Sequence, residues 1–227
     1  MHRVTRILAL CCAASCQGLQ RASPPGQPQC LLASANRRDL AKVRAASVQL
    51  GTSGSDEDVL VVGMGGTIDK DYPRTTLGYA FEIDEPAAER ILDTATAIGI
   101  SYAVLSICKK DSTEIVDADR DGLVEQVRTS SASRVVVTHG TDTMIETARY
   151  LLATGAAAGK AIAFTGAMKP ERFKDSDASF NFGGAVAATS LLPPGSVVVC
   201  MGGNVIPASV CERDTDTGRF IQSSSLS

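Results

Sequence analysis

The feature that most constrains the fold of this chain is a regular alternation between short apolar runs and longer stretches of helical periodicity. The apolar runs have the length of strands and fall at residues 59–64, 102–107, 135–138, 161–165 and 197–201. The helical stretches fall at residues 85–98, 117–128, 144–153 and 181–192. Buried strands that alternate with helices are typical of βαβ units, which form parallel sheets.

The residues at the helix ends agree with this pattern. Pro86 stands in the first turn of the first expected helix, where proline is favourable, and Gly99 follows its end. Every strand after the first follows a helix, so right-handed crossovers predict a single α/β domain with a doubly wound parallel sheet. We expect three layers, as in Rossmann and flavodoxin-like folds, over residues 58–222.

The segments outside this domain differ from it in composition. Arg3 and Arg6 precede apolar residues 7–14, and no acidic residue occurs before Asp39, which indicates a targeting leader over residues 1–38. Its pattern fits secretion, a plastid or a mitochondrion, with lipidation of Cys16 as a weaker alternative. We interpret residues 39–57 as a linker and residues 223–227 as a polar tail.

Two threonine-bearing loops directly follow apolar strands. The first is the Gly-Gly-Thr-Ile-Asp segment at residues 65–69, and the second is the Thr-His-Gly-Thr-Asp-Thr segment at residues 138–143. The carboxyl ends of parallel strands lie along one edge of a sheet, where ligands bind, so the two loops can face one pocket. Thr67 and Thr141 are therefore candidate partners in a site.

A third segment completes the pattern. Residues 165–170 read Thr-Gly-Ala-Met-Lys-Pro, and Ser176, Asp177 and Asn181 follow them. The three segments, in this order, resemble the bacterial-type L-asparaginases, which hydrolyse side-chain amides with threonine nucleophiles. The resemblance covers residues 59–220 and corresponds to the amino-terminal domain of the full-length enzymes. Short relatives that contain this domain alone form a group, and this chain looks like one of them.

The resemblance implies roles for particular residues. Thr67 would be the nucleophile, Tyr79 the tyrosine of a lid over the site, and Thr141 and Asp142 the second threonine with its acidic partner. Asp142 would also bind the ammonium group of an amino-acid substrate, and Ser112 its α-carboxylate. The implied substrate-binding residues are Gly66, Ser112, Gly140, Thr141 and Asp142. No metal and no organic cofactor is implied.

One position departs from the family pattern. Counting on from residues 201–205, the family's catalytic lysine falls on Arg213. An arginine does not release its proton near neutrality, so Arg213 cannot accept a proton, although it can orient Asp142 or stabilise negative charge. Two functions therefore stay open. One is an amidohydrolase acting on asparagine or a related small amide, and the other is a catalytically impaired amino-acid-binding domain on the same scaffold.

Each motif also has a simpler structural interpretation. Gly65 and Gly66 can make a tight turn in which Thr67 satisfies backbone groups. Thr141 and Thr143 can cap the helix that begins near residue 144, and we expect Asp177 to cap the helix that begins near residue 181. His139 fits a structural histidine. A nucleotide-binding loop is disfavoured because isoleucine occupies the third glycine position of the dinucleotide pattern and no Gly-Lys-Ser/Thr segment occurs.

The composition of the chain limits the kinds of molecule that we expect it to bind. The net charge of −3 is spread along the chain and gives no reason to expect a nucleic acid or a membrane surface. Cys108, Cys200 and Cys211 are an odd set in or beside apolar strands, which predicts buried free thiols. No Cys/His spacing suits zinc. The expected partner is a small polar substrate, and the resemblance also allows a homodimer.

Overall fold

The computed structural model of the protein describes residues 58–72, 81–95 and 98–223. The leader at residues 1–38, the linker at residues 39–57 and the tail beyond residue 223 lie outside the described residues. Tyr79 also lies outside them.

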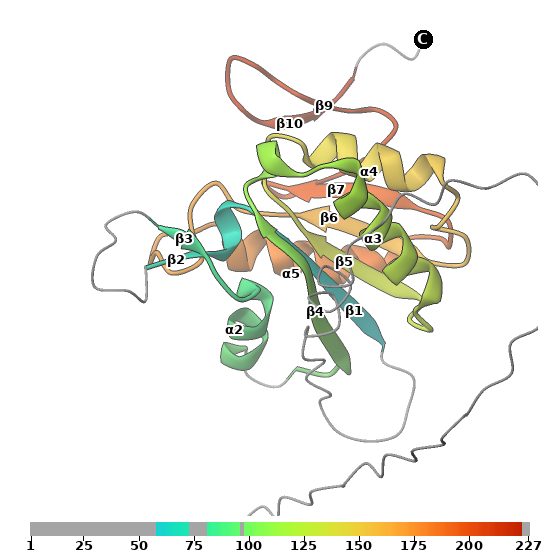
Figure 1. Cartoon of the computed structure of the whole chain (residues 1–227), viewed down its shortest axis with the longest axis horizontal. Helices are drawn as coiled ribbons and strands as arrows, with labels where there is room; N and C mark the ends of the chain where they lie inside the picture. The colour runs from blue at the N-terminus through green and yellow to red at the C-terminus, as the bar shows by residue number, and fades with distance from the viewer. Residues whose placement is uncertain (1–57, 73–80, 96–97, 224–227) are drawn as a thin grey trace, which may run out of the picture.

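The centre of the domain is a six-stranded sheet in the order β4-β1-β5-β6-β7-β8 (Figure 1). Its strands are β1 (Val59–Gly65), β4 (Tyr102–Lys110), β5 (Arg134–Thr138), β6 (Ala161–Thr165), β7 (Val197–Met201) and β8 (Asn204–Pro207). The first five are parallel, as predicted, and β8 is antiparallel to β7. The strand order reverses at β1, so the loops after β1 and β5 flank the point where doubly wound sheets bind ligands.

Helices cover both faces of the sheet, which gives the three expected layers. One face packs against α3 (Asp117–Thr129) and α4 (Met144–Ala153). The other packs against α2 (Ala87–Thr94) and α5 (Ala178–Leu191). Along β1, Leu60 and Val62 point to the first face and Val59 and Val61 to the second, and all four are buried. Burial on both faces explains why the strand is apolar throughout instead of alternating.

One crossover has the opposite hand to the others. The connections through α3 and α4 step in one direction along the sheet and cover one face, whereas α2 steps the other way and covers the other face, so these three share a hand. The connection through α5 steps in the same direction as α4 but covers the opposite face. Right-handed crossovers are nearly universal, so α5 is the left-handed exception. The expectation of right-handed connections throughout is wrong here.

The first helix is shorter than the predicted span of residues 85–98. Pro86 occupies the N-cap position of α2, and the free N–H of Ala87 donates to Oδ1 of Asp69 over 2.7 Å. The helix ends at Thr94, because Ala95 is already extended. A carboxylate far away in the sequence therefore sets where α2 begins, and no local pattern could show this. At the other end of the domain, α5 begins at Ala178, earlier than residue 181.

Three short antiparallel elements were not predicted. They are strand β8, the hairpin of β2 (Lys70–Asp71) with β3 (Glu82–Ile83), and the hairpin of β9 (Cys211–Arg213) with β10 (Phe220–Gln222). Each strand has two to four residues, which is too short for hydrophobic periodicity to develop. The β9–β10 hairpin stands outside the main sheet, beside α4 (Figure 1).

Two phenylalanines of α5 provide a test of this packing. Phe182 is 1% exposed in the core, whereas Phe180 is 67% exposed. We expect Phe182→Ala to lower the free energy of unfolding by about 3–5 kcal/mol, because it leaves a cavity. Phe180→Ala should lower it by less than about 1 kcal/mol, because the ring already contacts water. Urea unfolding of the two variants checks this, and equal losses would contradict the placement of α5.

Candidate active site

Three loops at the carboxyl edge of the sheet are in direct contact. A Cβ atom on Gly66, in the loop after β1, would lie 2.3 Å from Cα of Gly140, in the loop after β5. A Cβ atom on Gly140 would lie 2.6 Å from Cβ of Ser112, which follows β4 and is buried. The structure therefore brings together three predicted site residues, and only glycine fits at the two central positions.

The shape of the first loop follows from its glycines. Gly65 and Gly66 have φ angles of +81° and +87°, which other residues rarely adopt. The N–H of Gly66 donates to the carbonyl of Lys110 over 3.0 Å, so the loop is tied to the end of β4. A single 3-10 turn at Thr67–Asp69 then leaves Thr67 half-buried while Asp69 is enclosed. The tight-turn interpretation is correct for the glycines.

The hydroxyl groups of Thr67 and Thr141 have no hydrogen-bond partner within the part of the chain that the structure describes. Both residues are half-buried at the edge of the sheet. Their hydroxyl groups can therefore bind or react with a ligand without first breaking a bond to any described residue. Among the described residues, neither hydroxyl makes the purely structural bond that the simpler interpretation assigned to Thr67.

Thr143 links the second loop to Ser112. It occupies the N-cap position of α4, but its side chain makes no capping bond. Its hydroxyl instead donates to the carbonyl of Ser112 over 2.7 Å. The simpler interpretation, in which the Thr143 side chain caps α4, therefore does not hold, since the hydroxyl joins the loops that follow β4 and β5.

Arg213 lies beside Asp142, as counting along the sequence suggested. Nη1 of Arg213 contacts Oδ1 of Asp142 at 2.7 Å. The guanidinium also donates from Nε to the carbonyl of Gly218 and lies over the ring of Phe220. An arginine in this place holds a permanent positive charge against the carboxylate.

His139 is a buried residue of the second loop. Its Nδ1 lies 2.8 Å from the carbonyl oxygen of Gly140, and because a carbonyl only accepts, Nδ1 carries the proton. No partner for Nε2 occurs among the described residues. Burial lowers the pKa of this imidazole to about 4, so the ring is neutral at pH 7. These observations fit the structural interpretation of His139, although only one of its nitrogens is satisfied.

Asp69 is the residue of the first loop whose role the sequence did not reveal. Besides capping α2, it donates its N–H to the carbonyl of Gly66 and accepts the N–H of Asp84 at its own carbonyl. Burial raises the pKa of its carboxyl to about 7, although the Ala87 N–H and the charges of Arg90 and Lys109 oppose this. Asp69 therefore fixes the segment that presents Thr67.

The third segment, which includes Gly166 and Asn181, contacts the second threonine-bearing loop. Asn181, which is buried, donates from Nδ2 to the carbonyl of Gly166 and accepts the N–H of Gly202, both over 3.0 Å. A Cβ atom on Gly166 would lie 2.4 Å from the carbonyl oxygen of His139. The turn after β7 is thus connected, through Asn181 and the loop after β6, to the loop that carries Thr141.

Asp177 does not cap α5 as expected. It stands at the N-cap position, but its side chain makes no capping bond. The carboxylate accepts instead from the N–H groups of Met168 and Lys169 and from Nδ2 of Asn181. Its role is to shape the loop between β6 and α5.

That loop, residues 166–177, also reaches the first loop. The N–H of Glu171 donates to the carbonyl of Ile68, and the Glu171 carboxylate pairs with Arg90 of α2 at 2.7 Å. Arg172 pairs with Asp71 of β2 at 2.8 Å. Residues 166–177 therefore contact both threonine-bearing loops.

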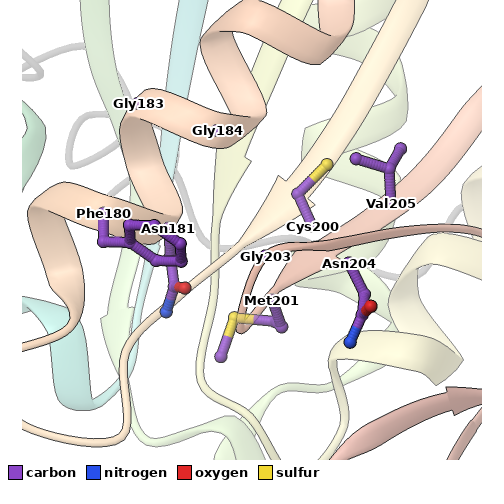
Figure 2. Close-up of a pocket in the computed structure, with 9 residues that line it drawn as sticks. All are labelled: Phe180, Asn181, Gly183, Gly184, Cys200, Met201, Gly203, Asn204 and Val205. Carbon is purple, nitrogen blue, oxygen red and sulfur yellow. The ribbon is translucent and has the colours of Figure 1, made fainter.

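A separate cavity of about 380 Å³ lies between α5 and strands β7 and β8 (Figure 2). Phe180, Met201 and Val205 line it with apolar surface, and Asn181 is the buried amide in its wall. No predicted catalytic or substrate-binding residue lines it, and it contains no charged group. The cavity therefore does not suit a polar, charged substrate, and the contact of the three loops is the better candidate site.

Metal ligands and thiols add little to the site. Within the described ranges, no group of three or more His, Cys, Asp or Glu residues is arranged to hold a metal ion. In those ranges there is also no helix of the length and hydrophobicity that a membrane span requires. Cys108, Cys200 and Cys211 are free thiols, as predicted, with the last two buried and Cys108 half-buried.

The close packing of Gly140 against Ser112 predicts a steric effect. We expect Gly140→Ala to lower the free energy of unfolding by about 1–3 kcal/mol, because the added methyl group must displace the Ser112 side chain or its loop. Gly184→Ala is the matched control, because its Cβ would enter open space on α5 and alanine favours a helix. Urea unfolding distinguishes them. A Gly140→Ala protein as stable as the control would contradict the contact.

Asp69 and His139 predict opposite responses to pH. The Asp69 contribution to stability is complete below its ordinary pKa of 3.8 and is lost as the pH rises through about 7. The His139 contribution is complete above its ordinary pKa of 6.5 and is lost as the pH falls through about 4. Relative to wild type, we expect the unfolding free energy of Asp69→Asn to rise with pH in this window and that of His139→Asn to fall, each by up to about 1.4 kcal/mol per pH unit.

Urea unfolding at several pH values between about 4.5 and 7 measures these slopes. The double variant is the internal control, because its slope should return to that of the wild type. A single variant that keeps the wild-type slope would show that the substituted group does not titrate as its burial requires.

Comparison with known proteins gives these loops a family. Residues 58–221 match the family model described as asparaginase, N-terminal. Among curated proteins, the sequence has no significant match. Solved structures with the same fold include three asparaginases, from Thermococcus kodakarensis, Campylobacter jejuni and Vibrio cholerae.

The thermostable L-asparaginase from Thermococcus kodakarensis is 23% identical, with a TM-score of 0.60, and the match covers 72% of this chain and 50% of that chain. The probable cytoplasmic L-asparaginase from Campylobacter jejuni is 21% identical, with a TM-score of 0.60, and the match covers 75% of this chain and 54% of that chain. L-asparaginase I from Vibrio cholerae is 17% identical, with a TM-score of 0.61, and the match covers 74% of this chain and 52% of that chain. The chain thus spans about half the length of these enzymes. From the family match over residues 58–221, we conclude that this chain belongs to the asparaginase family and corresponds to its amino-terminal domain.

Proposed function

We propose that the domain is an amidohydrolase that converts the side-chain amide of asparagine, or of a related small molecule, to the acid and ammonia. The observation that carries this proposal is the contact of Gly66, Ser112 and Gly140, which places the half-buried Thr67 beside two further loops. Family membership and the shared fold support it. A polar substrate suits this edge of the sheet better than it suits the apolar cavity.

Thr67 is the proposed nucleophile. Its Oγ1 forms a bond to the amide carbon, the bond from carbon to nitrogen breaks, and ammonia leaves with the hydroxyl proton. Water then hydrolyses the ester and restores the hydroxyl. A threonine hydroxyl is a poor nucleophile at neutral pH, so it needs a proton acceptor and donors for the developing oxyanion. Backbone N–H groups of the loops after β1 and β5 are the candidate donors.

Substrate recognition is assigned to Ser112 and Asp142. Asp142 uses Oδ1 to bind Arg213, which leaves Oδ2 for the ammonium group of an amino acid. Ser112 is enclosed against Gly140 and would hold the α-carboxylate through its hydroxyl. Gly66, Gly140 and Thr141 complete the proposed binding set.

The presence of arginine at position 213 limits which group can accept the Thr67 hydroxyl proton. Because a guanidinium keeps its proton at neutral pH, Arg213 cannot be the acceptor and serves to orient Asp142 and to stabilise negative charge. The acceptor must then be another group. Tyr79, which lies outside the described residues, is the proposed group, since the family pattern assigns proton transfer to this tyrosine.

The same arginine favours a second candidate function. A domain that retained Ser112 and Asp142 but lacked a working proton acceptor would bind asparagine or aspartate without turnover. Such a protein would be an amino-acid-binding domain on the asparaginase scaffold.

One experiment separates the two functions. Ammonia release from asparagine, glutamine and other small amides is measured for the wild type and for Thr67→Ala, together with aspartate binding by calorimetry. We expect Thr67→Ala to lower ammonia release by about a thousandfold or more, because the nucleophile is removed, and to keep aspartate binding. Thr129→Ala, an exposed threonine at the end of α3, is the control and should behave as the wild type.

Each outcome has a definite meaning. Equal ammonia release by Thr67→Ala and wild type would refute the nucleophile. No release by the wild type, with aspartate binding that is lost in Ser112→Ala, would establish the binding domain instead.

A further inference from the structure

The β9–β10 hairpin delivers Arg213 to Asp142, yet it pairs with no strand of the main sheet. Its internal contacts, from Arg213 to Gly218 and Phe220, hold the guanidinium within the hairpin. They do not fix the hairpin against the rest of the domain. The buried side chains of Cys211 and Phe220 attach the hairpin to the core. Apolar packing has no direction, so polar contacts from outside the hairpin are needed to fix the orientation in which Arg213 reaches Asp142.

Arg149 of α4 makes polar contacts of this kind. Its Nε donates to the carbonyl of Ala208 over 3.0 Å, and its Nη2 donates to the carbonyl of Cys211 over 2.8 Å. These two carbonyls bracket the turn that leads into β9, and Cys211 is the first residue of that strand. The planar fork of an arginine can hold two acceptors in one fixed geometry.

The same helix presents Asp142. The loop that carries Asp142 runs directly into α4 at Met144, and Arg149 follows in the second turn of the helix. An α-helix is a rigid element on this scale. The start of α4 therefore positions the Asp142 carboxylate, and the Arg149 side chain of the same helix hydrogen-bonds to the turn before β9 and to the first residue of β9, the strand that contains Arg213.

We infer that Arg149 is a positioning residue that sets the Asp142–Arg213 pair by holding the turn before β9 against α4. The inference deepens the proposed function, since the pair is assigned there to amino-acid recognition. Arg149 does not touch the proposed substrate and acts only through Arg213. It is exposed at the surface, so its removal should loosen the hairpin and leave the core folded.

Hydrogen exchange of the full chain tests the inference without any substrate. The variants are Arg149→Met, which keeps an apolar stem, Arg149→Lys, which replaces the fork with a single nitrogen, and Arg128→Met, an exposed arginine on α3 as the control. We expect the amides of β9 and β10 to exchange about tenfold faster in Arg149→Met, with an intermediate change in Arg149→Lys. The amides of β7 should be unchanged. Identical hairpin exchange in Arg149→Met and the control would overturn the inference.

A double-variant cycle tests the route through Arg213. We expect Arg149→Met to raise KM for the amide, or the dissociation constant of aspartate, by about tenfold, with a smaller effect on kcat. Arg213→Met should have at least as large an effect, and the double variant should lose no more than Arg213→Met alone. Losses that multiply in the double variant would show that Arg149 acts independently of Arg213 and would overturn the inference.

The two proposals can fail separately. A wild-type protein that neither releases ammonia nor binds aspartate would refute the proposed function. The exchange measurement would still decide whether Arg149 holds the hairpin.

Discussion

The close approach of two backbones, at Gly66 and Gly140, is the contact on which the rest of the site depends. Neither position has room for a Cβ atom, and Gly66 also has a φ angle that favours glycine. The contact joins the loops after β1 and β5, the strands at which the sheet order reverses. A wider separation would move the loop of Thr67 away from the loop of Asp142, so the backbone geometry comes before any side-chain chemistry.

Hydrogen bonds from distant elements hold these loops in place. Asp69 attaches the first loop to the start of α2, and Thr143 attaches the second to Ser112. Asn181 connects the loop after β6 with the turn after β7. These buried or half-buried polar groups have partners on other elements, which makes the arrangement specific, since a displaced loop would leave them unpaired.

Much of this was predictable from the sequence, because it depends on local patterns. The five parallel strands follow from apolar runs, and the shared edge of the sheet brings together the loops that carry Thr67, Ser112 and Thr141. What the sequence could not show depends on contacts between distant residues. No periodic signal in the sequence shows that Asp69 caps α2 or which groups Thr143 and Asp177 bind. The same holds for the hydrogen bonds from Arg149 to the turn before β9. The short strands β8, β9 and β10 are stabilised by their neighbours and not by their own composition.

The opposite hand of the α5 crossover has a consequence for how this fold can evolve. Because α5 lies on the same face as α2, residues 166–177 pass over the sheet edge towards α2, where Glu171 meets Arg90 and Arg172 meets Asp71. A descendant that restored the common hand would move α5 to the opposite face and draw this segment away from the first loop. Every strand could survive such a change while the site was lost, so selection for the site would preserve a topology that folding alone disfavours.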